Sequence, residues 1–118
     1  MNLSKKDLDS LRTALERKRA ELGRAHDENL AVGTHSPDER YPDPMDAATR
    51  AEEEAERLGL AQQERGLLRE IDRALAKLDA GTYGVSELSG QPIPVERLHA
   101  VPWARLTAEE EERRARRT

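Results

Sequence analysis

The chain has 118 residues, of which 36% are hydrophobic and 37% are charged, and it contains no Phe. Such a polar composition excludes a large multilayer core and is typical of long helices that bury only a narrow apolar seam. The 20 basic and 24 acidic residues give a net charge of −4, which argues against binding along a nucleic-acid backbone.

The chain also lacks cysteine, which excludes a disulfide framework, a thiol nucleophile and a thiolate-bound zinc. Its polar start, MNLSKKDLDS, does not look like a signal peptide. No apolar run reaches the roughly 18 residues that a membrane-spanning helix needs. A cytoplasmic protein without membrane contact is therefore expected.

A first long helix is predicted from residue 3 to about residue 32. Ser4 can cap it, with Asp7 three residues later in the first turn. Apolar residues follow at heptad a and d spacing, interrupted by two polar residues, in the order Leu8, Leu11, Leu15, Lys18, Leu22, Ala25 and Asn29. The segment 33–44 carries one Gly and three Pro, which predicts a turn that ends this helix.

A second helix is predicted from about Pro44 to Ala80. Its apolar stripe consists of Ala51, Ala55, Leu58, Ala61, Leu68, Ile71, Leu75 and Leu78. Gly59 and Gly66 lie inside it and are expected to loosen it locally. Each stripe can be buried only against the other, so the two helices predict an antiparallel coiled-coil hairpin over residues 1–80, with its tip at about 33–48.

The remaining residues, 81–118, change character. Gly81 suits the left-handed position that ends a helix. Turn formers and short β-like pieces follow, with a small core expected from Val85, Leu88, Ile93, Leu98, Val101, Trp103 and Leu106. The final residues, TAEEEERRARRT, place Thr107 at an N-cap, Glu in the first turns and Arg in the last, which predicts a short terminal helix.

The start of the second helix can be explained by helix capping alone. Asp43 is a candidate N-cap, Pro44 suits the first helical position, and Asp46 at the third can reach back to the cap. From these residues alone, capping is the favoured interpretation. Capping by one aspartate is compatible with partner binding by the other.

Two segments of the chain resemble parts of the DksA/TraR family of bacterial transcription factors, and they occur in the same order as in that family. The segment YPDPMDAATRAEEE is similar to the family's tip motif D-x-x-D-x-A, which is met by Asp43, Asp46 and Ala48. The segment GTYGVSELSGQPIPVERLHAVPWARL is similar to the family's zinc-finger segment. The likeness runs from the first helix onward. It implies a mainly α fold, with a long antiparallel hairpin, a small degenerate zinc-finger-like part at 81–118 and a short C-terminal helix.

The resemblance also implies a function. The hairpin is expected to enter the secondary channel of RNA polymerase and to set its acidic tip near the catalytic centre, which alters the stability of promoter open complexes. Ala48 is expected to let the tip approach closely. A monomer without specific DNA binding is expected. Minor polymerase contacts are expected from four arginines of the last helix, which are Arg113, Arg114, Arg116 and Arg117.

The chain departs from the family at its ligand positions. The four zinc cysteines correspond to Ser86, Ser89, Thr107 and Glu110, which do not supply the thiolate or imidazole ligands that a closed zinc site requires. The serines are expected to hold the turn by hydrogen bonds, with Leu88 adding apolar contact. The basic positions that bind the alarmone ppGpp in some members correspond to Glu70, Val101 and Glu111, which cannot pair with phosphate. No cofactor is therefore expected.

Other functions were weighed against polymerase binding. A helical-hairpin interaction module that has lost polymerase binding remains the main alternative. An enzyme is disfavoured, because two aspartates on a convex tip have no pocket that excludes water. A metal-free DNA-binding finger is disfavoured by the low basic charge of 81–106. His26 and His35 are expected to be solvated.

Overall fold

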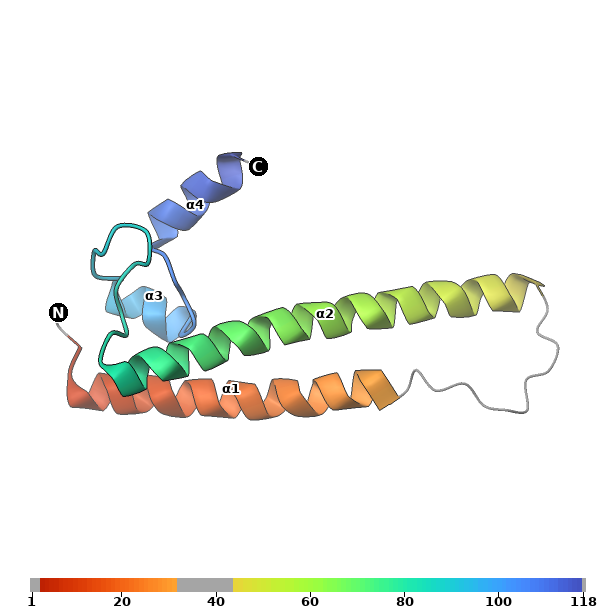
Figure 1. Ribbon diagram of the computed structural model, residues 1–118, viewed down its shortest axis with the longest axis horizontal. Helices are drawn as coiled ribbons and strands as arrows, with labels where there is room; N and C mark the ends of the chain where they lie inside the picture. Colours follow the sequence, from red (N-terminus) through yellow and green to blue (C-terminus); the bar gives the residue numbers. More distant parts are fainter. Residues whose placement is uncertain (1–2, 32–43, 118) are drawn as a thin grey trace. The chain divides into compact units, whose positions relative to one another are not determined.

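The computed structural model describes residues 3–31 and 44–117 (Figure 1). These residues form four α-helices in the order α1 (Lys5–Ala31), α2 (Pro44–Ala80), α3 (Val95–Ala100) and α4 (Ala108–Arg117). The only β pairing among them is an isolated antiparallel bridge between Val85 and Pro92. None of the described helices is both long and apolar enough to cross a membrane. The predicted mainly α fold with two long helices is confirmed.

Local signals start and end these helices as predicted. Ser4 Oγ accepts a hydrogen bond from Asp7 N at 3.0 Å, and Asp7 Oδ2 accepts one from Ser4 N at 3.4 Å. This reciprocal pair is a capping box. At the end of α2, Gly81 adopts a φ of 76°, while the amides of Gly81 and Thr82 donate to the carbonyls of Leu78 and Lys77. That is the Schellman arrangement, in which the left-handed residue is usually glycine.

The described residues group into two compact units, and α1 and α2 contribute to both. One unit contains residues up to 19 and from 69 onward. Within it, the start of α1 lies antiparallel to the end of α2 (Figure 1), where Arg12 pairs with Asp79 at 2.8 Å and Arg19 pairs with Asp72.

The core of this unit joins residues that are far apart in the sequence. Its largest fully buried side chains among the described residues are Leu11, Leu15, Ile71 and Leu98. Ile93 and Leu106 are buried as predicted. Tyr83, which the sequence analysis missed, is also buried and donates its hydroxyl to the carbonyl of Pro102 at 2.8 Å. Burial of this ring raises the pKa of Tyr83 to about 12.

Two predictions for residues 81–106 are wrong. The structure has the helix α3 where β-like pieces were expected. Pro94, with φ −55° and ψ 141°, precedes it, and its carbonyl accepts hydrogen bonds from Arg97 N and Leu98 N, so a short helix forms and buries Leu98. Leu88 was expected in the core, but its side chain is 72% exposed.

The second unit, residues 20–68, buries much less. Ala61 is its one buried hydrophobic residue among the described residues. His26, expected to be solvated, is only 14% exposed and lies with its Nδ1 3.7 Å from Glu64 Oε1.

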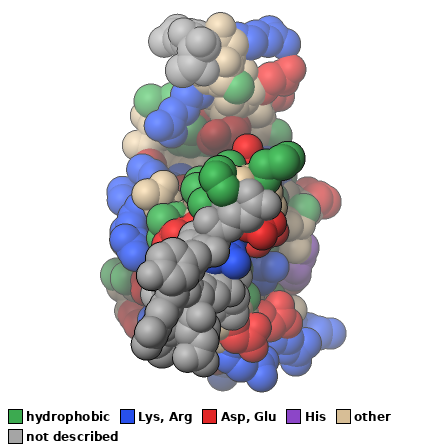
Figure 2. Space-filling view, turned by 90° about the vertical axis from the view of Figure 1, so that its right-hand side faces the viewer, with side chains coloured by type: hydrophobic (Ala, Val, Ile, Leu, Met, Phe, Trp, Pro, Cys, Tyr) green, Lys and Arg blue, Asp and Glu red, His purple; other side chains and the backbone are tan. Residues whose placement is uncertain are grey.

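The predicted apolar stripe of α2 does not extend to the helix start, because Ala51, Ala55 and Leu58 are exposed. The antiparallel pairing of residue 26 with residue 64 explains this, since by this register α1, which ends at Ala31, reaches no further than residue 59 of α2. Hydrophobic side chains, drawn in green, are exposed on the face shown in Figure 2. The exposed large hydrophobic residues of this unit are Met45, Leu58 and Leu60.

Candidate functional site

The predicted tip is described only from the start of α2 onward. Asp46 lies in the first turn of α2 and Ala48 follows two residues later, and both are exposed. A carboxylate in the first turn of a helix is favoured by the helix dipole, so Asp46 also supports the helix start. Asp43 and His35 lie outside the described residues, so capping of α2 by Asp43 stays a prediction.

The segment 84–93, called the knuckle turn below, is held by its own backbone and by two serines. Ser86 N donates to the carbonyl of Gln91 at 2.8 Å, and Gly90 N donates to the carbonyl of Ser86 at 2.9 Å. The hydroxyl oxygen of Ser86 accepts hydrogen bonds from the amides of Leu88 and Ser89 at 3.1 and 3.2 Å. Ser89 Oγ accepts one from Gln91 N. The prediction that the two serines hold this turn by hydrogen bonds is confirmed.

The four positions that the resemblance assigned to zinc ligands come together around the carboxylate of Glu110. Thr107 N donates to Glu110 Oε1 at 2.9 Å, and Glu110 N donates to Thr107 Oγ1 at 3.2 Å, which forms a capping box at the start of α4. The hydrogen bond from the Thr107 backbone, followed by those from the hydroxyls of Ser86, Ser89 and Thr107, lowers the pKa of Glu110 to about 2. Below, these four residues are called the Glu110 cluster.

The Glu110 cluster does not fit a structural zinc ion. Zinc in such sites takes thiolate or imidazole ligands, whereas this cluster offers three neutral hydroxyls and one carboxylate. The hydroxyl oxygens of Ser86, Ser89 and Thr107 already accept hydrogen bonds from backbone amides. Among the residues that the structure describes, no group of three or more His, Cys, Asp or Glu side chains is arranged to hold a metal.

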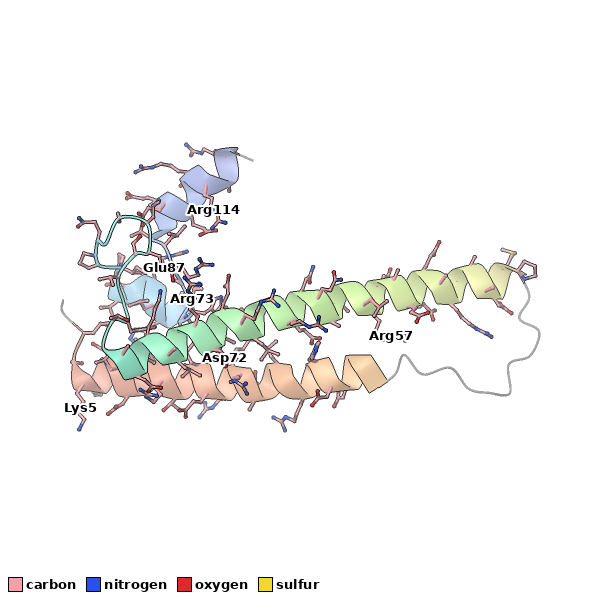
Figure 3. The ribbon with its side chains drawn as sticks, in the orientation of Figure 1. Lys5, Arg57, Asp72, Arg73, Glu87 and Arg114 are labelled. Carbon is pink, nitrogen blue, oxygen red and sulfur yellow. The ribbon has the colours of Figure 1, made fainter. Side chains whose placement is uncertain are left out.

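A second carboxylate ties the knuckle turn to α2. Glu87 accepts hydrogen bonds from Arg73 Nε at 2.6 Å and Arg105 Nε at 2.7 Å, and it pairs with Lys77 Nζ at 2.6 Å (Figure 3). Burial favours the neutral acid, but the hydrogen bonds from Lys77, Arg105 and Arg73 outweigh it and lower the pKa of Glu87 to about 2. The sequence analysis missed this cluster, because Arg73 and Lys77 of α2, Glu87 and Arg105 lie in three separate parts of the sequence.

The positions that the resemblance assigned to ppGpp binding carry two acids, which lie close to arginines. Glu70 and Glu111 line one pocket, whose other lining residues are Arg97, Trp103, Ala104, Arg105, Leu106 and Arg114. The pKa of Arg105 is raised by its hydrogen bond to Glu87 and, beyond that, by the charges of Glu70 and Glu111. The two acids therefore compensate arginine charge at the place where the family resemblance expects cations. Val101 is half-buried.

The prediction that Leu88 takes the place of the metal contact is wrong. Its amide is fixed by Ser86, but its side chain faces a groove of about 580 Å³ between the knuckle turn and α4. The other lining residues are Glu87, Ser89, Arg105, Leu106, Glu110, Arg113 and Arg114. Of the predicted polymerase-contact arginines, Arg113 and Arg114 therefore share one surface, while Arg116 pairs with Glu112 at 2.8 Å. Arg117 is the last residue of α4.

Known proteins identify the family. The chain is 34% identical to the RNA polymerase-binding transcription factor DksA of Escherichia coli (strain K12) over 106 residues, covering 88% of this chain and 68% of that protein. The structure of transcription factor DksA2 from Pseudomonas aeruginosa matches with a TM-score of 0.81 at 34% identity, covering 98% of this chain and 88% of that one. The chain belongs to the DksA/TraR family.

Other matches are shorter. General stress protein 16O of Bacillus subtilis (strain 168) is 61% identical, but only over 46 residues, or 39% of this chain. The chain covers 28% of that protein, and between 28% and 34% of the next two relatives. No protein-family model matches the chain. Within the DksA/TraR family, this chain combines the shared fold with an oxygen-only cluster at the four positions that the resemblance assigned to zinc ligands.

Proposed function

We propose that this protein regulates transcription by binding RNA polymerase. The observation that carries the proposal is the 34% identity to E. coli DksA, named as an RNA polymerase-binding transcription factor, over 88% of this chain. The match to DksA2 supports it, since it covers almost the whole chain and includes both long helices and the segment after them.

The proposed route is the one that the family resemblance implies. The hairpin enters the secondary channel, and the acidic tip with Asp43, Asp46 and Ala48 reaches the region of the catalytic centre. Asp46 and Ala48 are exposed at the start of α2, which leaves their side chains available to a partner. A partner shifts a conformational equilibrium only through its different affinity for the two states. The tip therefore acts by favouring one state of the polymerase–promoter complex, and it performs no chemistry.

We further propose that the protein works without zinc, and without ppGpp at the site that other family members use. The Glu110 cluster supports the first point, because its positions carry hydroxyls and a carboxylate in place of thiolates, and these groups already bond to one another or to backbone amides. The acids Glu70 and Glu111 support the second, because carboxylates repel phosphate.

A binding titration against RNA polymerase core tests the proposal, with open-complex lifetime measured in parallel. Wild type is expected to bind and to change the lifetime. Asp46→Asn is expected to bind while leaving the lifetime unchanged, because it removes a tip charge without altering the rest of the hairpin. Glu56→Gln, which neutralises another exposed acid of α2, serves as the matched control and is expected to behave as wild type. Absence of wild-type binding at micromolar concentrations would favour the alternative of an interaction module without polymerase binding.

A further inference from the structure

The two compact units differ in how much hydrophobic side chain they bury. Below, residues 20–68 are called the distal unit and the remaining described residues the proximal unit. The buried hydrophobic residues of the proximal unit include Leu11, Leu15 and Ile71, which are at most 1% exposed. The distal unit buries Ala61, whose side chain is a single methyl group. Because burial of hydrophobic side chains is the main source of folding free energy, the distal unit has much the smaller share of it.

The segments that pack on α1 and α2 explain this difference. In the proximal unit, the chain after α2 adds Tyr83, Ile93 and Leu98 to the core. The described part of the distal unit consists of the end of α1 and the start of α2. Two helices alone bury only the narrow stripe along which they face each other. The seam residues Leu22 and Ala25 are accordingly only half-buried.

Two glycines inside the helices of the distal unit weaken it further. Gly23 lies in α1 and Gly59 in α2, and neither has a positive φ. A Cβ atom added at either position would meet no other part of the protein within 4 Å. Neither close packing nor backbone conformation therefore requires glycine at these two positions. Each glycine makes the helical state roughly fivefold less favourable than alanine would, because glycine loses more backbone freedom on folding.

A buried histidine nitrogen also favours opening of the distal unit. His26 Nδ1 is buried and has no hydrogen-bond partner among the described residues, and Glu64 Oε1 lies 3.7 Å from it, which is too long for a hydrogen bond. Between the same two helices in the proximal unit, Arg12 Nη2 donates to Asp79 Oδ1 at 2.8 Å. A buried polar atom without a partner destabilises the closed state, because water satisfies it in the open state.

We propose that the distal unit opens as a separate cooperative unit while the proximal unit stays folded, and that Gly23 and Gly59 keep this opening frequent. Proteins open in contiguous cooperative segments, and the segments that bind partners are commonly the less stable ones. The distal unit carries Asp46 and Ala48. This end of the hairpin can therefore change conformation without unfolding of the main core. The inference concerns the free protein and goes beyond the proposed function.

Hydrogen exchange of the full chain under native conditions and at low urea concentrations tests the proposal. The protection factors of amides at residues 22–27 and 55–64 are expected to be at least about tenfold lower than those at residues 10–17 and 71–78. These four ranges avoid the described helix ends, which fray in any helix. The distal amides are also expected to share one urea dependence, smaller than that of the proximal amides, because their opening exposes less surface.

Two variants separate independent opening from opening of the whole hairpin. Gly23→Ala/Gly59→Ala is expected to raise the protection of the distal amides roughly tenfold or more, because it stabilises both distal helices without a clash. Ile71→Val removes one buried methylene group from the proximal core and is expected to lower the protection of the proximal amides roughly fivefold. It is expected to leave the protection of the distal amides unchanged, because the proximal unit stays folded in the open form.

The outcomes distinguish the two modes of opening. Lower distal protection, its rise in the double alanine variant and its indifference to Ile71→Val together support the proposal. Equal protection of both sets of amides in wild type overturns it. A parallel fall of both sets in Ile71→Val also overturns it, because the hairpin then opens as a whole. Distal protection that does not change in the double alanine variant overturns the role of the two glycines. None of these results depends on whether the protein binds polymerase.

Discussion

Glu110 lies at the start of α4 and interacts with residues of both α4 and the knuckle turn. Its carboxylate accepts a hydrogen bond from Thr107 N at 2.9 Å, and the nearby hydroxyls of Ser86, Ser89 and Thr107, on two separate segments, help to lower its pKa. An ionised carboxylate accepts stronger hydrogen bonds than a neutral one, and a carboxylic acid must use one oxygen as a donor. The contact between the knuckle turn and α4 therefore depends on the charge of this residue.

The stability of the protein is accordingly expected to depend on pH in the acidic range. The pKa of Glu110 is about 2 in the folded chain and 4.5 in its ordinary state, so the folded state binds this proton less readily. The stabilisation is present above pH 4.5 and is lost as the pH falls toward 2. Glu110→Gln is expected to flatten the decline of unfolding free energy in this window, without removing it, because Glu87 titrates in the same window.

Urea unfolding at several pH values between 2 and 7 measures this effect. Glu109→Gln, a change of an exposed residue in the same turn of α4, is the control and is expected to leave the slope as in wild type. A Glu110→Gln variant with the pH profile of wild type would show that the carboxylate charge does not hold the cluster together.

At the scale of elements, the two long helices were predictable because their signals are local. The Ser4–Asp7 capping box and Gly81 each act within one turn, and α2 has the predicted bounds. The helix α3 was missed because six residues are too few for an apolar period, and its Leu98 is buried only by partners distant in sequence. Leu88 was misplaced for a related reason, since nothing in the sequence of a tight turn says which side of it faces the core.

The Glu87 cluster joins three elements, namely α2, the knuckle turn and the segment after α3. The Glu87 side chain is 20% exposed and contacts three cations. Replacing Glu87 by Gln therefore leaves those cations with a weaker acceptor. Glu87→Gln is expected to lower the free energy of unfolding by about 2 kcal/mol. Glu112→Gln, in the exposed pair with Arg116, is expected to cost roughly 0.5 kcal/mol or less.

Chemical denaturation at neutral pH compares the two glutamates directly, because the substitution is the same and only its surroundings differ. Equal effects would mean that the Glu87 contacts are as solvent-screened as an ordinary surface pair. The sequence could not have predicted this difference, since Arg73, Lys77 and Arg105 are brought to Glu87 only by the tertiary fold.

At the scale of the whole molecule, the family resemblance predicted what local patterns could not. It aligned Ser86 and Ser89 with Thr107 and Glu110, about twenty residues apart, and the structure brings the four together. It could not say what would replace the metal, because Glu110 as a shared acceptor follows from the orientation of α4. The role of the tip and the division of the chain at residue 80 remain predictions.

A fold held by the Glu110 cluster should not respond to zinc or to its removal. In zinc-clamped domains the metal contributes folding free energy, so chelators unfold them. Here the hydrogen bonds within each pair, Thr107 with Glu110 and Ser86 with Ser89, need no ion, and the two serine hydroxyls lie near enough to Glu110 to lower its pKa. Thermal unfolding with EDTA, with no addition and with excess zinc is expected to give one melting temperature. Native mass spectrometry is expected to show the metal-free mass. A lower melting temperature in EDTA would mean that other ligands bind a structural ion, and a higher one in zinc would mean that the cluster accepts the metal despite its hydroxyl donors.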